Sequence, residues 1–107
     1  MTEITVVQGD YGYDINFILQ DANGGVFDLT GYSALLFRGQ LSTQISLKFS
    51  GAMTVVSASS GTCKYTVALG NFSSSGVYNA EIQVTFASGA IVTFSDIQVS
   101  VQPKIPF

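Results

Sequence analysis

The chain has no histidine and no tryptophan, and it has one cysteine among its 107 residues. Histidine is the commonest general base and metal ligand, so its absence excludes Ser-His-Asp and Cys-His catalysis and leaves no credible ligand set for zinc. A single cysteine excludes a disulfide scaffold. Because Cys63 alternates in phase with Tyr65 and Val67, we predict that it is a small buried side chain and not a reactive thiol.

Charged residues are also scarce. They make up 10% of the chain, whereas apolar residues make up 47%, and soluble domains usually carry about a quarter charged residues. This balance predicts either a large core for this length or an apolar surface that a partner covers. Four Lys and Arg stand against seven Asp and Glu, a net charge of -3, so the cationic footprint of a nucleic-acid-binding protein is missing. We expect no nucleic-acid partner.

Several functional segments are absent as well. No stretch approaches the roughly 18 apolar residues of a membrane-spanning helix, and residues 1–5 have no signal-peptide character. No glycine-rich loop follows a strand and opens a helix, so nucleotide binding has no support. The segment 21–25 begins like a calcium loop, but Gly25 and Tyr32 stand where that motif needs oxygen ligands. We expect no cofactor, no metal and no membrane partner, and synthesis in a cytoplasm.

What the chain does contain is alternation of apolar and polar residues with a period of two, interrupted by turn residues too often for helices. We predict strands over 4–8, 13–20, 26–29, 32–38, 45–49, 53–58, 63–69, 77–86 and 90–101. Residues 1–101 are expected to form one domain, and residues 102–107 an extended tail. In the last strand the apolar positions change parity between Phe94 and Ile97, which predicts a β-bulge at residues 95–96.

The segment 76–84 has the form of a tyrosine corner, carried by Gly76 and Tyr78. In such a corner a tyrosine near the start of a central strand returns a hydrogen bond to backbone a few residues upstream. With the short strands and frequent turns, it predicts an all-β fold, an immunoglobulin-like antiparallel β-sandwich of about eight strands in two sheets. The motif favours a binding or structural domain over an enzyme.

The acidic residues considered as catalytic candidates lie at turns or beside strands. Asn23 and Gly24 tolerate positive φ, so the chain is expected to reverse there, and Gly31, close to Asp28, marks a second break. Three aspartates fall at turns, where they accept local backbone hydrogen bonds, and three acidic residues lie beside strands: Asp10, Asp21, Asp28, then Asp14, Glu81 and Asp96. We interpret them as turn caps or solvated groups and not as a catalytic pair.

Candidate contact residues come from apolar and aromatic positions near strand ends. The run 34–37 is apolar on both faces, which suits a strand that is covered on two sides or lies beneath another chain. Tyr11 and Tyr32 stand near loops, where they can stack on a sugar or a protein partner. In the tail, two prolines favour an extended segment, so Ile105 and Phe107 are candidates for docking on a neighbouring subunit. We take Leu36 with these four residues as the candidate interface.

Three short motifs in the first third of the chain give a family resemblance: Gln8-Gly9-Asp10, Asp21 with Asn23-Gly24, and Asp28-Leu29-Thr30-Gly31. In this order they resemble the amino-terminal immunoglobulin-like domain of the phage baseplate upper protein family. The resemblance implies a structural adaptor that attaches to the tail tip and continues into parts that hold receptor-binding proteins. This chain departs from the pattern after Val101, where only six residues follow. It is therefore expected to be either a fragment or a stand-alone virion protein of similar fold.

Three functional hypotheses follow. The first is a non-enzymatic virion domain of a phage tail or baseplate, which assembles with other phage structural proteins or with copies of itself. The second is a carbohydrate-binding or adhesive module, for which the exposed tyrosines are the motivation. A head-fibre or capsid-decorating protein is a variant of the first, since similar motifs occur in such sandwiches. An enzyme is the weakest interpretation, because it rests only on scattered carboxylates.

Overall fold

The computed structural model describes residues 2–21, 23–43 and 48–103. Within these ranges the chain forms strands and no helix, so no helix that could cross a membrane is found there. The strands are β1 (Thr2–Val7), β2 (Asp14–Ile18), β3 (Tyr32–Leu41), β4 (Lys48–Ala52), β5 (Thr54–Ser57), β6 (Thr62–Thr66), β7 (Gly76–Phe86) and β8 (Ile91–Gln102).

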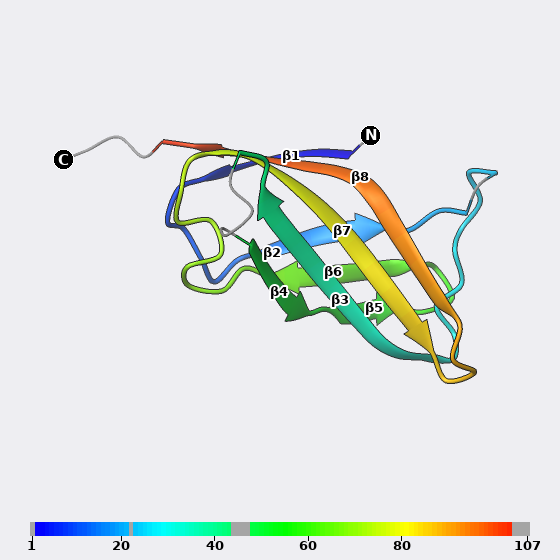
Figure 1. Cartoon of the computed structure of the whole chain (residues 1–107). Helices are drawn as coiled ribbons and strands as arrows, with labels where there is room; N and C mark the ends of the chain where they lie inside the picture. Colours follow the sequence, from blue (N-terminus) through cyan, green and yellow to red (C-terminus); the bar gives the residue numbers. More distant parts are fainter. Residues whose placement is uncertain (1, 22, 44–47, 104–107) are drawn as a thin grey trace.

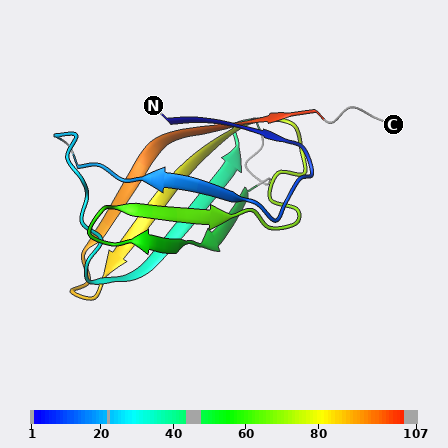
Figure 2. The same ribbon diagram turned by 180° about the vertical axis from the view of Figure 1, so that it is seen from behind.

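The strands form two sheets that pack face to face. The larger sheet has the order β1-β8-β7-β3-β4, and the smaller sheet has the order β2-β6-β5. Figure 1 shows the larger sheet in front with its strands crossing those of the smaller sheet at an angle, and Figure 2 shows the smaller sheet from its own side. The prediction of an all-β sandwich in two sheets is confirmed.

One pair of strands differs from the antiparallel expectation. β1 lies parallel to β8, with Thr2 opposite Ile97 and Val7 opposite Gln102, while the other paired strands are antiparallel. Alternation of apolar residues shows which side chains face the core, but it is the same for a strand read in either direction. No hairpin joins the first strand to the last, so no turn enforced their relative direction.

Two further expectations are corrected. Residues 26–29 do not form a strand, because Val26 makes only an isolated bridge with Gln20 and the chain then turns at Asp28. The run 34–37 is not covered on both faces: Leu35 and Phe37 are buried, whereas Ala34 is exposed and Leu36 is half-buried on the outer face. The expected strand over 45–49 lies partly outside the described residues, and its described part belongs to β4.

The predicted irregularity in the last strand is present. Ala80 lies opposite Ile97, and Ile82 lies opposite Phe94, so β8 carries one residue more than β7 between these pairs. The extra residue lies at 95–96, which is where the apolar parity changes. The bulge lets Phe94 and Ile97 both face the core, where Phe94 is partly buried and Ile97 is 6% exposed.

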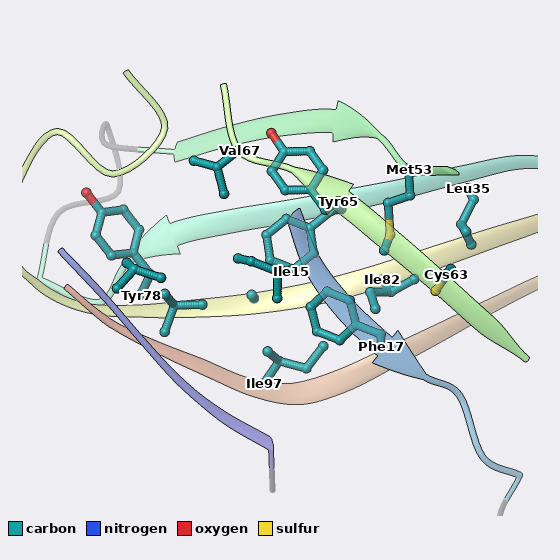
Figure 3. Packing of buried hydrophobic residues seen from close by; sticks show 14 of the residues in the cluster. Ile15, Phe17, Leu35, Met53, Cys63, Tyr65, Val67, Tyr78, Ile82 and Ile97 are labelled. Carbon is teal, nitrogen blue, oxygen red and sulfur yellow. The ribbon is translucent and has the colours of Figure 1, made fainter. Parts of the chain in front are cut away.

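The core between the sheets combines aliphatic side chains with aromatic rings. Side chains from both sheets share this space, including Ile15 and Phe17 from β2 and Ile82 from β7 (Figure 3). The ring of Phe49 occupies the space above Gly39, its cross-strand neighbour, and a Cβ built on that glycine would lie 2.7 Å from the ring. A glycine is therefore required at position 39, because any larger side chain would displace this ring.

Candidate binding surfaces

One end of the sandwich is built around Tyr78 at the start of β7. Its side chain is 2% exposed, and its hydroxyl donates a hydrogen bond to the backbone carbonyl of Ser74 at 3.1 Å. The ring packs edge-on against Phe72, with centroids 5.4 Å apart. Gly76, two residues before Tyr78, has φ of 133°, a conformation that side chains rarely adopt. These contacts fix the path of the connection between β6 and β7.

Asn71 holds the same connection from the other side. Its Oδ1 accepts a hydrogen bond from the Tyr65 hydroxyl at 2.5 Å and one from the backbone N–H of Ala68 at 2.8 Å. Burial raises the pKa of Tyr65, an effect that the bond to Asn71 partly offsets. The Phe72 carbonyl accepts from the Gly9 N–H at 3.0 Å, which ties the connection to the end of β1. Sequence reasoning did not single out this connection, although the apolar Phe72 within it was an available signal.

The opposite end consists of turns capped by carboxylates. Asp21 Oδ1 accepts hydrogen bonds from the N–H groups of Asn23 and Gly25, each at 2.9 Å, and Gly24 has φ of 83°. Asp28 Oδ1 accepts from Thr30 Oγ1 at 2.5 Å and from the Thr30 N–H at 2.8 Å. The bonds from the Thr30 hydroxyl and N–H lower the pKa of Asp28. Gly31, with φ of 87°, then leads into β3.

Asp14 and Glu81 do not form a catalytic pair. Asp14 contacts Thr66 Oγ1 at 2.5 Å and Lys64 Nζ at 3.3 Å, and the hydrogen bond from Thr66 lowers its pKa most. Glu81 lies 3.6 Å from Arg38. Asp14 belongs to the smaller sheet and Glu81 to the larger one, so the two face away from each other on opposite surfaces of the sandwich. The side chain of Asp96 is outside the described set.

Cys63 is fully buried, and this burial raises the pKa of its thiol to about 11. The thiol is therefore neutral at physiological pH and closed to solvent, which makes it a poor nucleophile. In the described part of the chain, no three cysteine or carboxylate side chains gather in a way that would hold a metal ion.

The candidate interface residues do not share one surface. Tyr11 is 58% exposed in the connection between β1 and β2, whereas Tyr32 is 41% exposed at the other end, opposite Phe86 at the end of β7. The blue connection near residue 11 and the cyan start of β3 lie at opposite ends of the molecule in Figure 1. Leu36 lies midway along β3, half-buried on the outer face. Ile105 and Phe107 lie outside the described residues.

A hollow of about 930 Å³ lies on the outer face of the larger sheet, which points toward the viewer in Figure 1. Its lining is polar, and strand register places Gln40, Asn79 and Gln98 side by side across β3, β7 and β8. The Arg38 guanidinium, next to this row, donates to Gln83 at 2.7 Å. Sequence reasoning did not single out this surface, although its residues are the polar half of the alternation that identified the strands.

Comparison with known proteins extends the resemblance seen in the first third of the chain. No curated protein gives a match. A family model for the BppU N-terminal domain, a domain of phage baseplate upper proteins, matches residues 1–106. The match spans both sheets and all eight strands. The chain therefore belongs to the BppU N-terminal domain family and is a structural domain of a phage baseplate.

Proposed function

We propose that this domain is a non-enzymatic adaptor that joins neighbouring proteins of the phage tail tip. The family match over residues 1–106 is the observation that carries the proposal. The described side chains fit it, because the carboxylates of Asp21 and Asp28 cap turns and those of Asp14 and Glu81 pair with surface cations. The chain would act through shape and hydrogen bonding on its surfaces.

The outer face of the larger sheet is suited to a polar partner. Amide side chains such as Gln40, Asn79 and Gln98 both donate and accept hydrogen bonds, so they can pair with exposed backbone or polar side chains of another protein. Interfaces of this kind are wet and depend on many modest contacts. A glycan-binding role has weaker support, because Tyr11 and Tyr32 lie too far apart to form one aromatic platform.

The test is reconstitution with tail proteins encoded by the same phage. We expect the purified chain to co-elute with at least one tail-tip protein in size-exclusion chromatography with light scattering, and not with the major capsid protein. Immunogold labelling of intact particles should place the protein at the tail tip. Labelling of the capsid surface, or binding to a glycan array without binding to any tail protein, would overturn the adaptor role.

A further inference from the structure

Four strands lie at the outer edges of the two sheets in the described part of the chain, and three of them are protected. β5 has only four residues and a register shift after Val55. β4 begins with Lys48 and contains Gly51, and a charged residue and a glycine both disfavour pairing with another strand. β2 has only five residues and begins with the ion-paired Asp14, a charged residue that disfavours pairing with another strand. These three edges are poor templates for another chain.

The fourth edge, on β1, is open. β1 pairs with β8 over six consecutive residues without a register shift. Five of its six residues are β-branched, and Glu3 is its one charged residue. β1 is the outermost strand of the larger sheet and has β8 as its one neighbour in the described part of that sheet. An exposed strand of this length and composition is a template for another strand.

The backbone groups that face this open edge can be identified. In a strand, the N–H and C=O of one residue point to the same side, and those of successive residues point to opposite sides. The Gln8 N–H donates to the Gln102 carbonyl at 2.9 Å, so even-numbered residues of β1 face β8. Glu3, Thr5 and Val7 therefore direct their backbone groups away from the sheet. The Val7 carbonyl also accepts from the Asp10 N–H at 3.2 Å and keeps one lone pair free.

The geometry points to a second copy of this chain as the occupant, bound through antiparallel pairing of β1 with β1 about a two-fold axis at Thr5. Opposed residues must both be odd-numbered, because only these present backbone groups to the second strand, and an axis at any residue of β1 meets this condition. An axis at Thr5 pairs all three outward-facing residues, Thr5 with itself and Glu3 with Val7, whereas an axis at Ile4 or Val6 pairs only two of them within the strand. Centring on Glu3 would oppose two like charges, and centring on Val7 would bring the turn that follows β1 into the pair.

In this register the side chains complement one another. Ile4 lies opposite Val6 of the second copy on the core side, and a partly buried Ile4 gains cover there. On the outer side Thr5 faces Thr5, and Glu3 faces Val7, which is 39% exposed. The two Glu3 carboxylates are offset by about 14 Å along the strands, because each is two residues from the axis at about 3.4 Å per residue. This distance exceeds the Debye length of about 8 Å in physiological salt.

The contact would join the two larger sheets into one continuous sheet through about six interchain hydrogen bonds. Its small area predicts a weak dimer that depends on protein concentration. This inference deepens the proposed adaptor role and rests on it for its purpose, but the contact itself is tested with the chain alone. Failure of self-association would leave binding to tail proteins intact, and failure of the adaptor role would leave the dimer intact.

Cysteine cross-linking tests the register. Cys63 is fully buried, so Thr5→Cys and Glu3→Cys each add one accessible thiol to the same edge. Under mild oxidation we expect Thr5→Cys to form a covalent dimer at least about tenfold faster than Glu3→Cys, since only residues on the axis bring their Cα atoms within disulfide range. Thr93→Cys, an exposed position on β8 away from β1, serves as the matched control. Equal rates for all three variants would overturn the proposal.

Sedimentation equilibrium tests the association without a covalent bond. Thr5→Lys places like charges opposite each other on the axis, and we expect the dimer dissociation constant to rise at least about tenfold. Thr5→Pro removes an outward-facing N–H without touching the bonds to β8, so the same loss is expected with an unchanged far-ultraviolet spectrum. Thr93→Lys should leave the constant unchanged. A chain that remains monomeric at millimolar concentration would overturn the proposal.

Discussion

The two ends of the sandwich hold the connections between their strands in different ways. At the end near Tyr78, a long connection is held by buried aromatic rings and by hydrogen bonds from residues distant in sequence, such as the bond from the Gly9 N–H to the Phe72 carbonyl. At the end near Asp28, short turns are held by carboxylates that bond to backbone two to four residues away. A long connection needs contacts with the core, because ordering it costs more conformational entropy. A short turn satisfies its backbone hydrogen bonds with its own nearby side chains. The first end should therefore carry more of the stability.

The largest effect is expected from Phe72→Ala at the aromatic end. Phe72 is 1% exposed and packs against Tyr78 and Phe49, so its removal should lower the free energy of unfolding by about 3–5 kcal/mol. Urea denaturation followed by circular dichroism measures the change. If this variant does not fold, Phe72→Leu should still lower the free energy of unfolding by about 1 kcal/mol. Val26→Ala, at an exposed position of the other end, is the control, and an equal cost there would contradict the comparison.

Asn71→Ala is expected to come next. It leaves the Tyr65 hydroxyl and the Ala68 N–H without their acceptor, at a cost of about 1–3 kcal/mol in unfolding free energy. A double-mutant cycle with Tyr65→Phe isolates the shared bond. The cost of Asn71→Ala should be smaller in the Tyr65→Phe background. The same cost in both backgrounds would show that the two side chains are not coupled.

Tyr78→Phe should have a smaller effect, because it removes one hydroxyl and keeps the buried ring. The lost hydrogen bond to Ser74 is worth about 1 kcal/mol. Thermal unfolding by calorimetry measures the shift in Tm. Tyr11→Phe, which removes a hydroxyl from an exposed tyrosine, should leave Tm unchanged. A larger loss from Tyr11→Phe than from Tyr78→Phe would reverse the assignment of the corner.

The smallest effect is expected from Asp28→Asn at the turn end, and it should depend on pH. The hydrogen bonds from Thr30 lower the pKa of Asp28 in the folded chain relative to the unfolded chain. The group therefore contributes stability above its unfolded pKa of about 4, and this contribution is lost as pH falls through the folded pKa. The difference in Tm between the native chain and Asp28→Asn should shrink from about pH 6 to about pH 3. A constant difference would contradict this role of the carboxylate.

The sequence predicted strands correctly where one face of the strand had to be buried in the core. Alternation located the second strand and the long strands near the end, and the parity change between Phe94 and Ile97 located the bulge, because burial on one face leaves a period of two. The tyrosine corner at Tyr78 could be predicted because its motif lies within one short segment of the sequence.

Features that depend on pairing between distant segments could not be predicted. The parallel arrangement of β1 and β8 leaves no mark on either strand's alternation. Residues 26–29 alternate like a strand but have no neighbour along most of their length. The polar row of Gln40, Asn79 and Gln98 arises from the register of three strands far apart in sequence. Asn71 was missed for another reason: its bond to Tyr65 depends on the path of the connection after β6, which alternation does not record.

The direction of β1 relative to β8 has a mechanical consequence. Because the two strands run the same way, Thr2 and Gln102 lie at opposite ends of their shared ladder. Tension that separates these two residues shears one strand along the other, so all the hydrogen bonds between β1 and β8 bear the load together. In an antiparallel terminal pair, the same tension would break the hydrogen bonds one at a time from one end. A domain closed in this way resists stretching along its strands.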